Sequence, residues 1–208
     1  MKYVEDSFSI MVVGKWNASI LSPHWIGKTI LEAEEVEVQV AVGDPKLPIR
    51  IKHDNVLISP SPDSLNISPL IRSNLAFEKA EDVAFKITSL LQYTPVVAYG
   101  INFNFIEDDP SLALLDRISI ADSNDFLDRD MNIVGTNITR SFKLVDTLIN
   151  FSLINDGTDF HFKFNFHYDV QTAADISSAI KGKFKSNLVT VEKILNEIYG
   201  YSLNVLEG

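Results

Sequence analysis

Residues 156–170, DGTDFHFKFNFHYDV, place an aromatic ring at every second position. The rings belong to Phe160, Phe162, Phe164, Phe166 and Tyr168. Because successive side chains of a β-strand point to opposite faces, this alternation predicts a strand with five rings on one face and polar residues on the other. A row of five rings has to be buried against another layer, so the chain must build a sheet with one covered face.

Further strands are predicted on both sides of this one. Residues 133–144 and 147–155 precede it, and the Asp156–Gly157 pair is typical of a tight hairpin that makes neighbouring strands antiparallel. Earlier strands are expected at residues 8–16, in the alternating valines of 36–42 before a turn at 43–45, in a hairpin at 48–59 and at 96–107. Gly100 indicates a bulge or a close approach within its strand. Residues 59–69 contain three prolines and are predicted to be a long loop.

Two segments show the period of an amphipathic helix. Residues 75–92 place Ala80, Val83, Ala84 and Ile87 on one face, and residues 172–199 repeat the pattern with Gly182 as a break. The pattern predicts an α+β fold: an extended, mainly antiparallel sheet with these helices on its apolar face. We expect a single domain over residues 1–208. The alternative is two similar halves, 1–130 and 131–208, because INFNF at 101–105 resembles KFNF at 163–166.

Composition limits the partners and the location. The 208-residue chain has a net charge of -10, which disfavours binding to a phosphate backbone, and 46% hydrophobic residues, which suffice for a core. It has no cysteine, no signal-peptide pattern and no uncharged stretch long enough to cross a membrane. We therefore expect an acidic, soluble, cytoplasmic protein that is not inserted in a membrane and does not bind nucleic acid.

Two of the four histidines lie on the polar face of the aromatic strand. His161 and His167 are six residues apart, which is about 20 Å along a strand, so one metal ion cannot bridge them. Their neighbours on the face do not supply the three or four ligands of a zinc site. We interpret this face as the solvated side of the strand.

Recognisable catalytic and metal motifs are missing from the rest of the chain. Asp128, Asp130 and Asn132 have the spacing of a calcium loop, but Ile133 replaces the glycine of the turn and Thr139 replaces the final glutamate. Gly14 and Lys15 resemble the end of a phosphate loop without its other residues. The sequence contains no hydrolase, zinc-protease or dinucleotide signature, so we expect neither a metal, nor a cofactor, nor an enzyme.

Three hypotheses remain, and the one with the least support is a hydrolase or metal-dependent enzyme centred on the histidines or on the carboxylates of residues 116–130. The leading hypothesis is a non-enzymatic protein that acts through protein–protein contacts, including self-association at an exposed sheet edge. The alternative is a module that binds a hydrophobic small molecule in an aromatic pocket between sheet and helix. The residues predicted to line that pocket are Tyr99, Phe103, Phe105, Phe162, Phe164 and Phe166.

Overall fold

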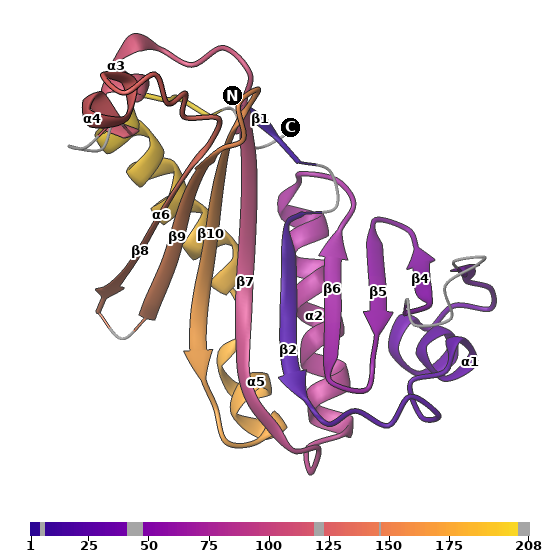
Figure 1. Cartoon of the computed structure of the whole chain (residues 1–208). Coiled ribbons are helices and arrows are strands. Elements are labelled where there is room, and N and C mark those ends of the chain that lie inside the picture. Colours follow the sequence, from indigo (N-terminus) through magenta and orange to yellow (C-terminus); the bar gives the residue numbers. More distant parts are fainter. Residues whose placement is uncertain (5–6, 41–47, 119–122, 146, 204–208) are drawn as a thin grey trace.

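The computed structural model describes residues 1–4, 7–40, 48–118, 123–145 and 147–203 (Figure 1). The strands are β1 (Lys2–Tyr3), β2 (Ser9–Gly14), β3 (Glu37–Gln39), β4 (Arg50–His53), β5 (Val56–Pro60), β6 (Ser64–Pro69), β7 (Val96–Glu107), β8 (Thr136–Leu144), β9 (Thr147–Asn155) and β10 (Phe160–Asp169). The helices are α1 (Pro23–Trp25), the π-helix η1 (Ile26–Leu31), α2 (Asn74–Leu90), α3 (Leu112–Ile118), α4 (Ser123–Leu127), α5 (Ala173–Ala179) and α6 (Lys183–Tyr199).

All ten strands belong to one antiparallel sheet. Its order is β3-β4-β5-β6-β2-β7-β10-β9-β8, and β1 pairs with one end of β7. β10 pairs with β7 through ten residues and with β9 on its other side, with Phe164 facing Phe103 and Phe151. The predicted α+β fold, the antiparallel pairing and the Asp-Gly hairpin are confirmed.

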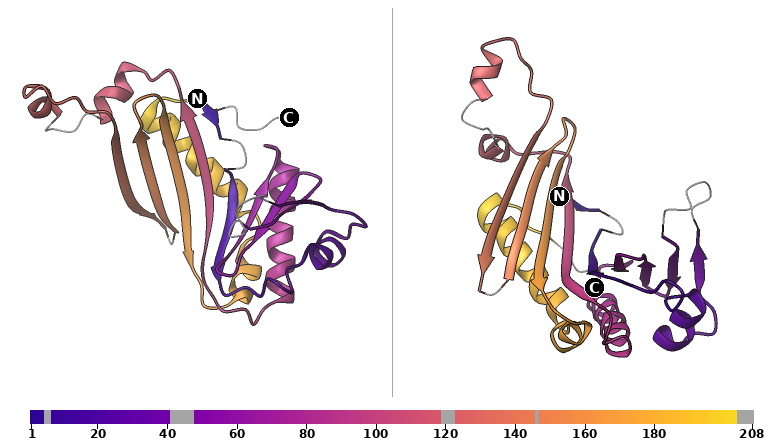
Figure 2. Two further views of the ribbon diagram at one scale, coloured as in Figure 1. Left: turned by 45° about the vertical axis from the view of Figure 1, so that its right-hand side comes forward. Right: turned by 60° about the horizontal axis from the view of Figure 1, so that its bottom comes forward.

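Helices α2, α5 and α6 cover one face of the sheet, and no described helix lies on the other face (Figures 1 and 2). The apolar stripe of α2 is buried as its spacing predicts, because Ala80, Val83, Ala84 and Ile87 point toward the strands. The predicted helix at 172–199 divides into α5 and α6. Gly182 adopts a left-handed φ of 75° between them, a conformation that glycine adopts at little cost.

The two halves of the chain repeat one strand order, except that the first half has an additional edge strand, β3. β2 is followed by a helical segment, by β3 to β6 and by α2, while β7 is followed by α3 and α4, by β8 to β10 and by α6. In each half the first strand pairs with the last strand, β2 with β6 and β7 with β10. β2 and β7 then pair with each other and join the halves into one sheet. The repeat changes at the connection between α2 and β7, whereas the sequence alternative divides the chain near residue 130; whether one domain or two is the better description stays a prediction.

The predicted loop at 59–69 is wrong. β5 continues to Pro60 and β6 begins at Ser64, so the two strands form a hairpin. Pro60 and Pro69 stand at the ends of these strands and Pro62 stands in the turn, where a missing N–H removes no bond inside the ladder. Three closely spaced prolines therefore mark strand ends here.

The valine strand near residue 38 is shorter and more exposed than predicted. β3 is only three residues long and lies at one edge of the sheet, where Val38 and Val40 are exposed. Val38 still pairs with an apolar residue, Ile51, on the neighbouring strand. An edge strand has one neighbour instead of two, which leaves its apolar residues partly uncovered. The predicted turn at 43–45 lies outside the described residues.

Of the helices in the described part of the chain, none combines the length and the apolar composition that a membrane crossing requires.

Candidate functional site

Each histidine of β10 pairs with its own aspartate. His161 Nε2 lies 3.0 Å from Asp156 Oδ2, and His167 Nε2 lies 3.0 Å from Asp169 Oδ1. Both aspartates are largely exposed, and the two pairs occupy opposite ends of the strand. These are isolated pairs at the surface, where an ion pair contributes little to stability.

Asp156 also serves the β9–β10 turn. The backbone N–H of Asp159, followed by the hydroxyl and the N–H of Thr158, donates to its carboxylate, and these bonds with that of His161 hold the pKa of Asp156 well below its usual range. Three of these four hydrogen bonds come from the turn itself, so the turn accounts for the lowered pKa of Asp156.

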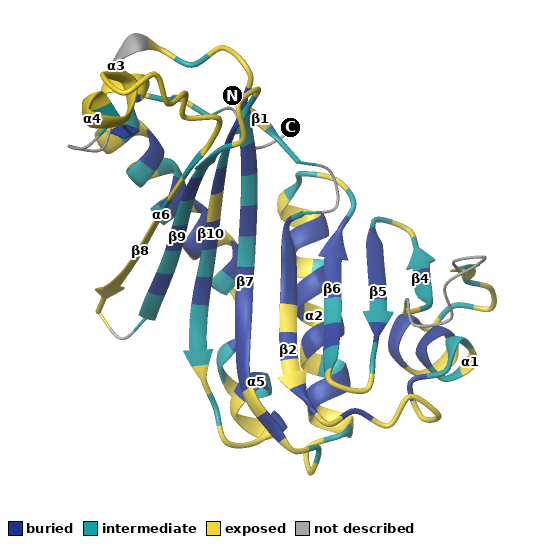
Figure 3. Ribbon diagram, viewed as in Figure 1, coloured by how far each residue is buried: buried dark blue, intermediate teal, exposed yellow. Residues whose placement is uncertain are grey.

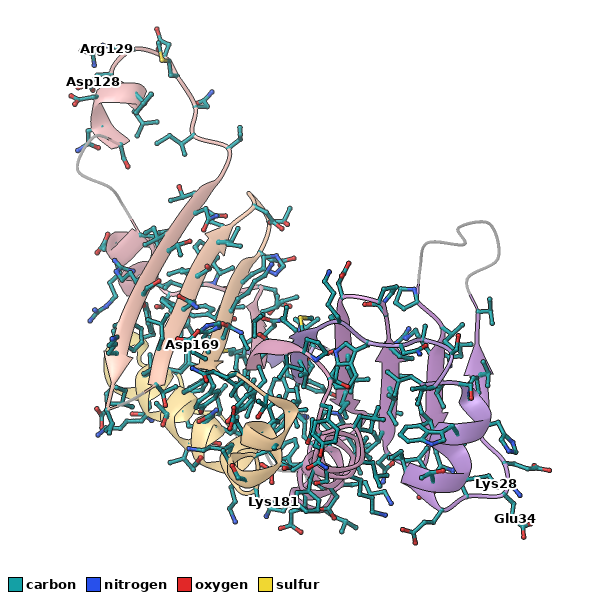
Figure 4. All side chains as sticks on the ribbon, turned by 90° about the horizontal axis from the view of Figure 1, so that it is seen from below. Lys28, Glu34, Asp128, Arg129, Asp169 and Lys181 are labelled. Carbon is teal, nitrogen blue, oxygen red and sulfur yellow. The ribbon has the colours of Figure 1, made fainter. Side chains whose placement is uncertain are left out.

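The described carboxylates of residues 116–130, the candidates for a divalent-ion site, do not gather with other described acidic side chains. Figure 4 shows Asp128 and Arg129 at the far tip of the α4 segment, well away from Asp169 on the sheet. Among the residues that the structure describes, no three histidine, aspartate or glutamate side chains lie close enough to share a metal ion.

The uncovered face of the sheet carries a row of hydrogen-bonded polar side chains. Asn165 Nδ2 donates to Asn102 Oδ1 at 2.8 Å, and Asn150 Nδ2 donates to Asn165 Oδ1 at 3.2 Å. The row continues from Asn102 to Ser9 and from Asn150 to Ser141, so it crosses five neighbouring strands. Gly100 keeps this row in place, because a Cβ there would lie 2.5 Å from Asn165 Nδ2. The predicted close approach at Gly100 is therefore with a side chain.

The six rings predicted to line a pocket are at most 2% exposed. They pack against each other and against helix residues: the rings of Phe103 and Phe184 meet edge to face at 5.2 Å, and Tyr99 stacks on Tyr168 at 4.5 Å. Burial raises the pKa of Tyr99 above its ordinary value. None of the six lines any of the cavities found in the described part of the chain. Ligand binding by these residues stays a prediction, and it would require the core to open.

A smaller cavity between sheet and helix lies at the β8 edge. It encloses about 380 Å³. Its lining residues, here called the arginine pocket, are Arg117, Arg140, Phe142, Phe151, Leu153, Ile194, Ile198 and Tyr199. The sequence reasoning missed this set. Two spacings in the sequence could have indicated it. Arg140 and Phe142 are two residues apart, on one face of a strand, and Ile194 and Ile198 are one helical turn apart.

A second cavity lies on the uncovered face of the first half. It encloses about 760 Å³ and is lined mainly by serines and by Met11, Leu57 and Asn66. Asn66 Oδ1 is buried and has no hydrogen-bond partner among the described residues. This cavity is more polar than the arginine pocket and lies on the opposite face of the sheet.

β8 forms one edge of the sheet and is its most exposed long strand. It pairs with β9 over nine residues, and no described strand pairs with its other side (Figure 3). It carries Arg140 and Lys143 and no carboxylate. Phe142 and Leu144 are both exposed. An edge of this length presents a row of unpaired backbone N–H and C=O groups to a partner.

No protein-family model and no curated protein matches this chain.

Proposed function

We propose that the protein acts through protein–protein contacts, by accepting an extended segment of a partner at the outer side of β8. The observation that carries this proposal is the nine-residue edge with no described neighbour. In such strand addition the main-chain hydrogen bonds supply affinity, and alternate side chains supply specificity. The other edge, β3, has only three residues and offers far fewer bonds.

The charge of β8 supports a partner segment with carboxylates. Arg140 and Lys143 make the strand positive in a chain whose net charge is -10. Two copies of β8 would bring four cations into one short ladder, and like charges facing each other are destabilising. An acidic segment of another protein is therefore the better match, and self-association is the weaker form of the same contact. The acidic composition without cysteine supports a cytoplasmic location, which is part of this proposal.

The test compares the two edges by the same substitution. Phe142→Lys adds a third cation to β8, and Val38→Lys is the matched control on β3; both residues are exposed, so we expect both variants to fold. Light scattering over a range of concentrations measures self-association, and affinity purification from host lysate followed by mass spectrometry identifies partners. Self-association that is kept by Val38→Lys and lost by Phe142→Lys supports the proposal, because the added cations repel each other. An acidic partner that binds Phe142→Lys more tightly than the wild type and binds Val38→Lys unchanged supports it equally. A protein that stays monomeric and whose partners bind both variants equally contradicts it.

The arginine pocket favours a second candidate function, the binding of a small hydrophobic molecule. Six of its eight lining residues are aliphatic or aromatic, and it lies between the sheet and α6. Pockets that bind small molecules have this composition, an apolar lining with a few polar groups that fix the orientation of the ligand. The pocket contains none of the six rings predicted from the sequence. Both sets of residues lie in the layer between the sheet and the helices.

A further inference from the structure

The two arginines of the arginine pocket have no partner in the described part of the chain. Neither Arg117 nor Arg140 makes an ion pair or a hydrogen bond with a described residue. Other basic side chains of the chain do form ion pairs, for example Lys86 with Glu32 and Lys181 with Asp82. Both arginines are exposed and line one apolar cavity, in a chain with 28 acidic residues and 18 basic ones.

The arginines come from different elements and line the same pocket. Arg117 lies on α3 and Arg140 on β8, and both oppose the rise that burial causes in the pKa of Tyr199. The phenol of Tyr199 therefore lies within the electrostatic reach of both guanidinium groups. Its ring forms a wall of the pocket together with Phe151, at a ring separation of 5.6 Å.

The remaining wall is apolar. Leu153 of β9 lies on the helix-facing side of the sheet, and Ile194 and Ile198 lie on α6. A ligand that fills this space must be apolar along most of its length and negatively charged at one end. A fully apolar ligand would leave the guanidinium groups without a partner, and a phosphate-rich ligand would find too few polar groups.

We propose that the arginine pocket binds a fatty acid of medium chain length. The carboxylate lies between Arg117 and Arg140, where bidentate charge-assisted bonds are available, and the aliphatic chain lies against Phe151, Leu153 and Ile194. The cavity of about 380 Å³ is at the small end of the range for ligand pockets, about 300 to 1,000 Å³, so it holds a single chain of medium length. This inference rests on the second candidate function and adds the chemical class of the ligand.

Isothermal titration calorimetry with decanoate and with 1-decanol distinguishes the contribution of the carboxylate to affinity from that of the aliphatic chain. We expect decanoate to bind at least about tenfold more tightly than 1-decanol, because the alcohol lacks the charge that the arginines recognise. In a series of carboxylates from hexanoate upward, affinity should rise about fourfold for each added methylene until the pocket is full.

Four variants test the residues. Arg117→Gln and Arg140→Gln should each weaken decanoate about tenfold and leave 1-decanol unchanged. Lys143→Gln is the matched control, because Lys143 is a cation of the same strand that points to the opposite face and does not line the pocket. Ile198→Trp fills the pocket from a half-exposed position and should remove binding of both ligands.

The outcomes distinguish the two levels of the proposal. If 1-decanol binds as tightly as decanoate, or if the arginine variants bind decanoate normally, the fatty-acid inference is wrong while the hydrophobic pocket stands. If neither ligand binds at concentrations up to about 1 mM, both the inference and the second candidate function are wrong.

Discussion

The two halves of the sheet share one strand order and bury different kinds of side chain. In the first half the helix-facing residues are aliphatic, with Ile51, Ile58 and Ile67 in register on three neighbouring strands. In the second half the same layer is aromatic, with Phe103, Phe164 and Phe151 in register. The same topology therefore accommodates two core chemistries, because helix and sheet need a filled layer between them and the strand order does not specify what fills it.

The uncovered faces also differ. β10 and β6 hold equivalent places in the two halves, and each carries an asparagine on the uncovered face. Asn165 is hydrogen-bonded on both sides, whereas Asn66 has one carbonyl oxygen without a partner among the described residues and an amide nitrogen 3.5 Å from Ser68 Oγ. The second half has a continuous polar row, and the first half has a cavity at the corresponding place.

The largest expected effect comes from placing a charge in the aromatic layer. Phe164→Asp should cost more than about 4 kcal/mol and abolish cooperative unfolding, because an unpaired carboxylate replaces a ring that is 1% exposed. Circular dichroism during heating measures the loss. Phe142→Asp is the control, since it makes the same change at a ring on the edge strand and should cost less than about 1 kcal/mol. Equal losses would mean that the aromatic layer is not the core of this half.

The next effect concerns Glu81, which links the helices of the two halves. This carboxylate of α2 is 2% exposed and accepts from the N–H groups of Gly182 and Phe184, at 2.7 and 2.6 Å, at the start of α6. Glu81→Ala should cost about 1–3 kcal/mol, because it leaves these donors without a partner. Urea denaturation measures the loss, and the exposed Glu78→Ala should change stability by less than about 0.5 kcal/mol. A silent Glu81→Ala would show that the helices are held together by apolar contacts alone.

Glu81 also predicts a pH dependence. Burial raises the pKa of its carboxyl above the ordinary value of 4.5, although the hydrogen bonds from Phe184 and Gly182 and the charge of Lys181 oppose the rise. The folded state then holds this proton more tightly than the unfolded state, so the contribution of Glu81 falls as the pH rises from the unfolded pKa through the folded pKa. The stability of the wild type minus that of Glu81→Gln should decline over this range and become constant above it. A difference that grows with pH would contradict the assignment.

The two asparagines sharpen the comparison of the uncovered faces. Asn165→Ala should cost about 1–2 kcal/mol, because it removes two hydrogen bonds and leaves Asn102 and Asn150 each without one partner. Asn66→Ala should be neutral or stabilising by up to about 1 kcal/mol, because it removes a buried oxygen that has no partner among the described residues. Chemical denaturation of both variants measures the difference. Equal losses would mean that the polar row does not distinguish the halves.

The smallest expected effect is that of His161→Ala. Its partner Asp156 is held by the turn, and the pair lies at the surface, so the change in stability should stay below about 0.5 kcal/mol. Thermal denaturation near neutral pH checks it. A loss of several kcal/mol would assign this histidine a role that the structure does not indicate.

Local patterns were enough for most elements of the fold. The alternating rings of β10, the Asp156–Gly157 turn and the apolar stripe of α2 each depend on neighbours in sequence, and all three are confirmed. The β5–β6 hairpin was missed, because proline marks strand ends and loops alike and only the pairing of β6 with β2 distinguishes them. The arginine pocket was missed because Arg117, Arg140 and Tyr199 are far apart in the chain and none belongs to a motif.

The sequence by itself determined that this protein has an antiparallel sheet with one face covered by helices. Apolar residues that recur every two positions in a strand, or every 3.6 positions in a helix, identify the face of the element that is buried. The tertiary structure decided which strands become edges, that the six predicted rings fill the core, and that two arginines converge beside an apolar cavity. Periodicity is a property of neighbours along the chain. Convergence depends on strand order, which is set by contacts between residues about a hundred positions apart, such as Ser9 of β2 with Asn102 of β7.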